Sequence, residues 1–295
     1  MIEDDKDALQ HLIEKELNSN DKFLKPDFSQ RNGRELLAFY LQAKFKQLQA
    51  FDSTASKPII ASVRNDFIQN FSRRLISNPD KKIMIGITGE SASGKSTICR
   101  AIYDVIKSFN MPVSILTTDN YFNDISALIN KYGSFDELRD NGYDIDAPES
   151  FQLETLKNDL KTLAEGIDIY APEYLPNGTG VSLPKSKLVK TNKVIIVEGI
   201  ASMYDGVKDI FDIKVYVEAD LNTRKDRFLR RAYTERNQDL KNALKHWDYI
   251  LGAGLRYVQP AREYADLVLN GDTDMDYFMQ LLEYIHTITN NFISA

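Results

Sequence analysis

One stretch of eight residues, from Gly89 to Ser96, limits the fold more than any other part of the chain. It reads Gly-Glu-Ser-Ala-Ser-Gly-Lys-Ser and matches the pattern of a phosphate-binding loop. Its two glycines allow the backbone to turn so that its N–H groups point inward, toward the oxygens of an anion. Such a loop lies between a strand and the N-terminus of a helix, so the sequence predicts an α/β fold.

The residues on either side of the loop fit this arrangement. Residues 83–88 form a short apolar run that predicts a strand, and residues 95–109 carry apolar side chains on one face of a predicted helix. An accidental Gly/Ser loop is the alternative, and these flanking elements make it the weaker interpretation. Cys99 falls on the apolar face of the helix, which favours packing over a role as a reactive thiol.

Beyond the loop, short apolar runs alternate with helical patterns. The runs predict strands at 113–117, 194–197, 213–217 and 267–269, and the helical patterns lie at 151–164, 222–236, 239–251 and 274–290. With the strand before the loop, they predict a five-stranded parallel sheet with helices on both faces, the architecture of P-loop NTPases.

The first 80 residues differ from the rest, because their apolar residues recur at helical spacing. One such stripe runs from Ile60 to Leu75. We therefore expect a helical N-terminal extension, 1–80, followed by a P-loop domain, 81–295. The extension carries no catalytic constellation; it either packs on the main domain or serves as an oligomerisation or partner-binding module.

Composition narrows the choice of partners. A formal net charge of −6 argues against nucleic acid or an anionic membrane surface as the main partner. No apolar run approaches the roughly 18 residues of a membrane span. A single cysteine and an N-terminus without a signal-peptide pattern predict a cytoplasmic protein. A homo-oligomer stays open.

The loop predicts ATP and Mg²⁺ as cofactors. Lys95 is expected to contact the β- and γ-phosphates, and the Ser96 hydroxyl to bind Mg²⁺. The N-terminus of the following helix adds its positive dipole. The predicted nucleotide-binding residues are Gly89, Glu90, Ser91, Ala92, Ser93, Gly94, Lys95, Ser96, Thr97 and Arg227.

Two carboxylates end predicted strands. Asp119 follows the strand at 113–117, and Glu198 follows the strand at 194–197. If both strands flank the strand that precedes the loop, both carboxylates face the γ-phosphate, since ligands bind beyond the carboxyl ends of such strands. Asp119 is then a candidate base and Glu198 a candidate Mg²⁺ ligand. The alternative for either residue is a helix cap or a turn.

Five arginines lie within thirteen residues of a predicted helix: Arg224, Arg227, Arg230, Arg231 and Arg236. A helix that closes over the nucleotide could use such charges to stabilise the transferred phosphoryl group. The alternative is a solvated helix whose arginines pair with neighbouring acids.

In this order the motifs resemble the uridine kinase and phosphoribulokinase family of P-loop kinases, over about residues 82–272. The resemblance is carried by Gly89 to Thr97, Thr118 to Phe122, Asp146 with Pro148 and Phe151, Pro172 with Tyr174, Glu198 to Ile200, Arg227 with Arg231, Thr234 to Arg236, and Arg262 to Leu267. It implies a small β-hairpin near 168–190, an arginine-bearing lid near 224–240, and transfer of the γ-phosphoryl group of ATP to a hydroxyl of a small metabolite.

The resemblance also implies roles for individual residues. Asp119 is the expected base, and the expected catalytic residues are Asp119, Lys95, Arg231 and Arg236. The expected acceptor-binding residues are Tyr121, Phe122, Asp146 and Tyr174.

The chain departs from the uridine kinase pattern where the base is recognised. Ala147 and Val181 stand in place of a histidine and an arginine, and the lid reads Glu235-Arg236-Asn237-Gln238 instead of Glu-Arg-Gly-Arg. Without polar side chains that hydrogen-bond to the base, an enzyme distinguishes less well between one nucleoside and another. A pantothenate kinase-like enzyme is one alternative, supported by Thr117-Thr118-Asp119 but not by the residues that follow. A non-catalytic ATP-binding protein is another.

Overall fold

The computed structural model describes residues 59–64, 67, 81–108, 111–175, 178–235 and 238–273. The chain divides into two compact units, and nearly all described residues belong to the unit made of 61–64 and 81–272. The account below concerns that unit. Most of the predicted N-terminal helices, the predicted helix at 274–290 and Arg236 lie outside the described residues.

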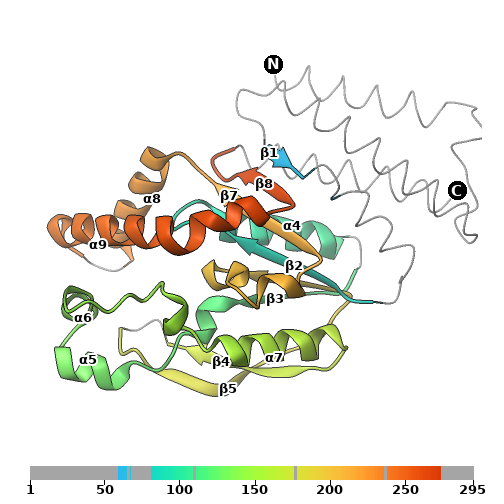
Figure 1. Ribbon diagram of the computed structural model, residues 1–295, viewed down its shortest axis with the longest axis horizontal. Helices are drawn as coiled ribbons and strands as arrows, with labels where there is room; N and C mark the ends of the chain where they lie inside the picture. Colours follow the sequence, from blue (N-terminus) through green and yellow to red (C-terminus); the bar gives the residue numbers. More distant parts are fainter. Residues whose placement is uncertain are drawn as a thin grey trace, which may run out of the picture. The chain divides into compact units, whose positions relative to one another are not determined.

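A six-stranded sheet forms the centre of this unit, in the order β1-β8-β7-β2-β6-β3 (Figure 1). Neighbouring strands from β8 to β3 pair in parallel. The strands are β1 (Ile60–Val63), β2 (Ile83–Thr88), β3 (Val113–Thr117), β6 (Val194–Glu198), β7 (Ile213–Glu218) and β8 (Leu267–Asn270). The predicted α/β fold is confirmed, and all five predicted strands are present.

The edge strand β1 corrects the sequence analysis, which placed Ile60 and Val63 on a helix. The two residues are three positions apart, which fits one face of a helix. A segment this short fits a strand equally well, so the spacing of its apolar residues cannot distinguish a helix from a strand. Next to β1, the Arg64 backbone N–H donates to the Asp266 carbonyl oxygen at 2.9 Å, and the Arg64 guanidinium forms a 2.7 Å ion pair with the Asp266 carboxylate. The sheet therefore has six strands rather than five.

In the part of the chain that the structure describes, four helices of twelve or fourteen residues are amphipathic. They are α4 (Lys95–Ser108), α7 (Leu153–Ala164), α8 (Leu221–Thr234) and α9 (Leu240–Ala253). Helices α4 and α7 pack against the sheet, and α8 and α9 pack on each other. Burial raises the pKa of the Cys99 thiol in α4 to about 12, so this cysteine is a packing residue, as expected. Among the described residues, no helix is long and apolar enough to cross a membrane.

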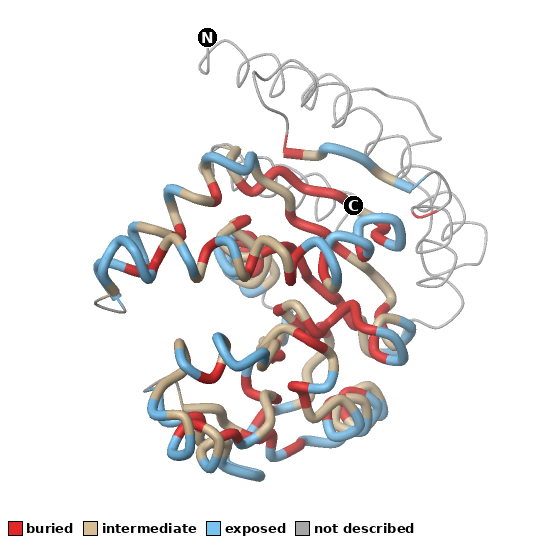
Figure 2. Tube along the Cα trace, turned by 60° about the vertical axis from the view of Figure 1, so that its left-hand side comes forward, coloured by how far each residue is buried: buried red, intermediate tan, exposed pale blue. Residues whose placement is uncertain are grey.

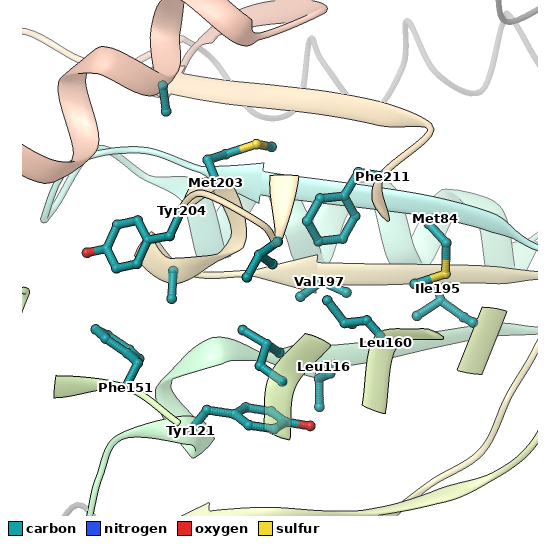
Figure 3. Packing of buried hydrophobic residues seen from close by; sticks show 14 of the residues in the cluster. Met84, Leu116, Tyr121, Phe151, Leu160, Ile195, Val197, Met203, Tyr204 and Phe211 are labelled. Carbon is teal, nitrogen blue, oxygen red and sulfur yellow. The ribbon is translucent and has the colours of Figure 1, made fainter. Parts of the chain in front are cut away.

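The core lies on both faces of the sheet, because its central strands are buried along almost their whole length (Figure 2). On one face Met84 and Ile195 pack in a single cluster with Leu156, Leu160 and Leu163 of α7 (Figure 3). Helix α4 contacts β2, β3 and β6. This packing fixes the ends of β2, β6 and β3, where the candidate site residues lie.

Smaller elements surround the end of β3. They are α5 (Ser126–Tyr132), α6 (Phe135–Asp140) and the antiparallel pair β4 (Ile169–Tyr174) and β5 (Ser182–Val189), which lies where the hairpin was expected. The two short helices were not predicted, since one or two turns give too little periodicity to recognise. Their ends do carry local signals: Gly133 is left-handed at the end of α5, and the Ser134 side chain accepts a hydrogen bond from the Glu137 N–H.

Candidate active site

The loop between β2 and α4 is fixed by close backbone approaches. Gly89 and Gly94 have φ angles of +156° and +98°, which side chains other than glycine rarely adopt. A Cβ atom on Gly89 would lie 2.3 Å from the carbonyl oxygen of Val217, and one on Gly94 would lie 2.8 Å from that of Gly271. Both glycines are therefore required by the shape of the loop as well as by its turn.

The first turn of α4 brings a hydroxyl to a carboxylate. The Ser96 Oγ donates to Glu198 Oε2 at 3.1 Å, although the two residues are 102 positions apart. Hydroxyl and carboxylate oxygens are ligands that suit Mg²⁺, which usually takes only one or two from protein and the rest from phosphate and water. Among the described residues, no three acidic, histidine or cysteine side chains gather to hold a metal alone. The pair fits Mg²⁺ bound together with a phosphate.

The strand order corrects one premise of the sequence analysis. Only β6 flanks β2 on this side, and β3 lies one strand further out. In the parallel register, Glu198 is opposite Ile87 of β2 and opposite Thr117 of β3. Glu198 therefore lies between the phosphate-binding loop and Asp119.

Asp119 does not cap a helix. It lies in the first turn of a 3₁₀ helix, Thr118–Tyr121, that is capped by Thr117, whose Oγ1 accepts from the Asp119 N–H at 3.3 Å. The Asp119 side chain still reaches solvent. The structure thus leaves its carboxylate available for chemistry, which removes the alternative of a capping role.

The surroundings of Asp119 raise the pKa of its carboxyl group. Burial by the surrounding protein is the main cause; the positive charge of Lys95 opposes it, and the negative charge of Glu198 adds to it. These charges also show that Lys95, Glu198 and Asp119 lie in one electrostatic neighbourhood. A carboxylate with a raised pKa is a stronger base than an ordinary aspartate, so it is suited to accept a proton.

The ends of β3 and β6 touch at Gly199. A Cβ atom at this position would lie 2.0 Å from Thr118 Oγ1, and the φ angle of Gly199 is +132°. Thr118 Oγ1 is buried without a hydrogen-bond partner among the described residues. Gly199 therefore permits the close approach that places Asp119 next to Glu198.

The arginines of α8 separate into two groups. The Arg227 guanidinium donates to the carbonyl oxygens of Gly271 at 3.1 Å and Ala92 at 3.4 Å, and Arg224 forms an ion pair with Glu90 at 2.8 Å. These side chains hold the loop itself. Arg231 is exposed one turn beyond Arg227.

The predicted acceptor-binding residues divide as well. Phe122 stacks against Phe151 and Tyr174, with ring centroids 4.2 Å and 5.2 Å apart. The Tyr174 hydroxyl has no hydrogen-bond partner among the described residues, and burial raises its pKa to about 12. Asp146 is half-buried, and its backbone carbonyl oxygen accepts from the Tyr204 hydroxyl.

Tyr121 requires a correction, because its side chain belongs to the core rather than to an acceptor site. It is fully buried, packs in the cluster that contains Leu160, and donates its hydroxyl hydrogen to Asp159 of α7 at 2.8 Å (Figure 3). The tight 3₁₀ turn gives Tyr121 and Phe122 different surroundings, and only Phe122 stays next to Tyr174.

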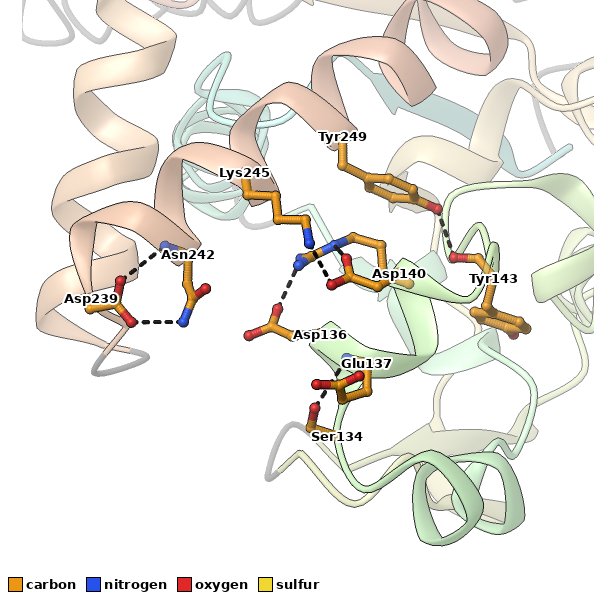
Figure 4. Close-up of polar contacts among 10 residues, drawn as sticks. Ser134, Asp136, Glu137, Asp140, Tyr143, Asp239, Asn242, Lys245 and Tyr249 are labelled. Atoms are coloured by element: carbon orange, nitrogen blue, oxygen red, sulfur yellow. Dashed lines mark hydrogen bonds and ion pairs between the residues drawn. The ribbon is translucent and has the colours of Figure 1, made fainter.

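Sequence reasoning missed a set of contacts between residues at the end of α6 or just after it and residues of α9 or of the turn that follows it; Figure 4 shows the two that involve Lys245 and Tyr249. We call it the clasp; it consists of the Lys245–Asp140 and Arg256–Asp144 ion pairs and the hydrogen bond from the Tyr249 hydroxyl to the Tyr143 carbonyl oxygen. Its partners are about 105 to 112 residues apart in sequence. No local pattern marks such pairs.

Known proteins are similar to this chain in sequence. Uridine kinase from Clostridium botulinum (strain Okra / Type B1) is 30% identical over 64% of this chain and 88% of its own length. Uridine kinase-like protein 5 from Arabidopsis thaliana is 28% identical over 69% of this chain, but only 42% of its own length is matched. The phosphoribulokinase structure from Rhodobacter spheroides is 13% identical, with a TM-score of 0.48 over 63% of this chain and 68% of that one.

The family model described as "Phosphoribulokinase / Uridine kinase family" matches residues 84–276. The match includes the phosphate-binding loop, Asp119, Glu198 and helix α8. It covers well over half of the chain and confirms the resemblance drawn from the motifs. The chain belongs to the phosphoribulokinase / uridine kinase family.

Proposed function

We propose that this chain is an ATP-dependent kinase that transfers the γ-phosphoryl group to a hydroxyl of a small metabolite, in the manner of a uridine kinase. The observation that carries the proposal is that Ser96 at the start of α4 donates to Glu198 at the end of β6, while Asp119 follows the neighbouring strand β3. Phosphoryl transfer needs a phosphate cradle, a metal ligand and a proton acceptor close together. The loop is suited to be the cradle, Ser96 and Glu198 to bind the metal, and Asp119 to accept the proton.

When bound, Mg·ATP supplies the phosphoryl group and the metal charge. The loop's backbone N–H groups and Lys95 would hold the β- and γ-phosphates, while Ser96 and Glu198 would provide the protein oxygens for Mg²⁺. Asp119 would accept the proton of the acceptor hydroxyl while the oxygen of that hydroxyl attacks the γ-phosphorus and ADP leaves. Arg231 and Arg236 are proposed to stabilise the charge during transfer.

Phe122, Tyr174 and Asp146 are the proposed contacts of the acceptor. Burial is the main cause of the raised pKa of Tyr204, and the negative charges of Asp146, Asp144 and Asp119 add to it. Three carboxylates thus lie around this tyrosine, and their charge favours a neutral acceptor. Arg256 is paired with Asp144 at 2.8 Å, so it neutralises that carboxylate but not Asp146 or Asp119. A carboxylated acceptor would meet repulsion here, so a nucleoside-like polyol fits better than pantothenate or glycerate.

The test is a screen of the full chain with Mg·ATP against uridine, cytidine, adenosine, pantothenate, glycerate and a sugar phosphate. ADP release would be measured, and phosphorus NMR would identify the product. We expect phosphorylation of a neutral hydroxyl compound, and a strongly reduced rate with Asp119→Asn. ATP binding without turnover on any acceptor would favour the alternative of a non-catalytic ATP-binding protein.

Pyrimidine nucleosides are expected to be weakly selected within that class. The two departures from the uridine kinase pattern, Ala147 and Val181, each remove a hydrogen bond to the base that is worth about 1–3 kcal/mol. Together they should lower pyrimidine selectivity by roughly a hundredfold, taking about 1.4 kcal/mol per tenfold. A low Michaelis constant for uridine, well below that for adenosine, would contradict this expectation.

A further inference from the structure

The phosphate-binding loop contains an acid, although its ligand is an anion. Glu90 follows the first glycine of the loop, and only 9% of its surface is exposed. A buried carboxylate so close to bound phosphates would repel them unless another group neutralised it. A positively charged side chain must therefore neutralise Glu90.

That side chain is Arg224 of α8. Its guanidinium lies 2.8 Å from Glu90 Oε2, and the exposed fractions of the two side chains are 5% for Arg224 and 11% for Glu90. Arg224 Nε also donates to the carbonyl oxygen of Ser91 at 3.1 Å. One arginine thus neutralises the acid and binds the loop backbone at the neighbouring residue.

The surroundings of the pair exclude solvent. The Arg224 guanidinium lies 5.7 Å from the centre of the Trp247 ring, and the Tyr216 hydroxyl is 3.5 Å from Glu90 Oε2. On the other side, a Cβ atom at Gly254 would lie 3.0 Å from Glu90 Oε1. In such a dry site the interaction between charges is stronger than at the surface, and removing one partner leaves the other uncompensated.

We propose that Arg224 is a positioning residue for nucleotide binding: it cancels the charge of Glu90 and ties the loop to α8 without touching the nucleotide. This inference rests on the proposed binding of ATP at the loop. It differs from the interpretation that all five arginines act on the transferred phosphoryl group, because Arg224 is buried and its partners belong to the loop.

If Arg224 acts by neutralising Glu90, replacing Arg224 and replacing Glu90 should change ATP affinity in different directions. Arg224→Met leaves a buried, unpaired carboxylate beside the phosphates, so the dissociation constant for ATP should rise by about 30-fold or more. Glu90→Gln leaves an uncompensated positive charge, so ATP affinity should stay the same or increase. The double variant Glu90→Gln/Arg224→Met should lie within about fivefold of the wild type, because neither charge remains.

The experiment is isothermal calorimetry of ATP and of adenosine with the wild type and these variants. Arg100→Met is the control, since Arg100 is an exposed arginine on α4 that pairs with Asp104 and not with the loop. The loss in Arg224→Met should be much larger for ATP than for adenosine, which carries no phosphate. If Arg224→Met does not fold, Arg224→Lys replaces it; it keeps the charge but loses the forked contact, and it should weaken ATP binding by less than about tenfold.

Equal losses of ATP and adenosine binding would overturn the inference, as would a double variant no better than Arg224→Met. So would a loss of ATP affinity in Glu90→Gln as large as that in Arg224→Met. A wild-type protein that binds no ATP would overturn the proposed function and, with it, this inference. If the wild type binds ATP and only the variants behave otherwise than expected, the inference alone fails.

Discussion

The phosphate-binding side and the acceptor side of the site are built differently. On the phosphate side, the Glu90–Arg224 ion pair has exposed fractions of 11% and 5%, and glycine Cβ positions are blocked by backbone atoms. On the acceptor side, the Lys245–Asp140 pair of the clasp has exposed fractions of 58% and 33%. Buried, closely packed groups tolerate few substitutions, whereas exposed pairs contribute little and can change freely.

This difference explains where the chain departs from its family's pattern. The phosphate-binding loop matches the motif at every fixed position, whereas Ala147 and Val181, both on the acceptor side, replace polar residues of the uridine kinase pattern. Changing a side chain around the acceptor alters which molecule is bound. Changing Lys95 or one of the two loop glycines would weaken phosphate binding itself.

Among the substitutions that test this difference between the two sides, we expect Asp119→Asn to have the largest effect on the rate of phosphoryl transfer. Asp119→Asn keeps the shape but removes the proton acceptor, so transfer should fall by on the order of 10²–10⁴-fold while ATP binding survives. Steady-state kinetics and calorimetry measure the two effects separately. Near-normal turnover would show that another group takes the proton.

The same variant has a pH signature. Because the pKa of Asp119 is raised, mainly by burial, wild-type activity should decline as the pH falls through that raised pKa. The protonated form is favoured in the folded protein, so Asp119 destabilises the fold at neutral pH relative to its protonated form. We therefore expect Asp119→Asn to raise the melting temperature at pH 7, with the gain disappearing under acidic conditions. A melting temperature lowered equally at every pH would contradict this.

Lys95→Ala is expected to have the next largest effect. A charged hydrogen bond to phosphate in a partly desolvated site contributes about 1.5–3 kcal/mol, so ATP affinity should fall by roughly 10–100-fold. Lys107→Ala, at the other end of the same helix, is the matched control. Unchanged ATP affinity in Lys95→Ala would disprove the assignment of the phosphate site.

Tyr174→Phe sharpens the acceptor side. Its hydroxyl has no partner among the described residues, so removing it should leave the melting temperature unchanged or slightly higher. If the hydroxyl binds the acceptor, the Michaelis constant for the acceptor should rise by about tenfold while that for ATP stays constant. With a pKa raised to about 12, the hydroxyl stays neutral, so the effect should not vary between about pH 6 and 9.

The smallest effect is expected in the clasp. Lys245→Ala removes an exposed ion pair with Asp140, so the urea midpoint should fall only slightly, and by even less at high salt. Urea denaturation at low and high ionic strength measures this. A large fall in the midpoint would show that the acceptor side is held as rigidly as the phosphate side.

The sequence was most informative where one segment determines its own structure. The loop motif and the apolar runs beside it were sufficient to predict β2 and α4, whereas the roles of Lys95 and Ser96 stay predictions. Strand order was not accessible, because the position of β6 between β2 and β3 depends on packing between distant segments. Tyr121 and Phe122 look equivalent in sequence, and only the 3₁₀ turn at the end of β3 decides which of them enters the core.

The two buried contacts of α8 have a consequence for motion. Arg224 and Arg227 attach the first two turns of this helix to the loop, so the helix cannot swing as a rigid lever about its N-terminal end. Any closure over the nucleotide must pivot beyond Arg227, where Arg230, Arg231 and Tyr233 are exposed. Phe228 and Ala232 also pack on α9, so amide hydrogen exchange should be slow as far as Ala232 and fast only in the exposed end of the helix, which should slow when ATP is added.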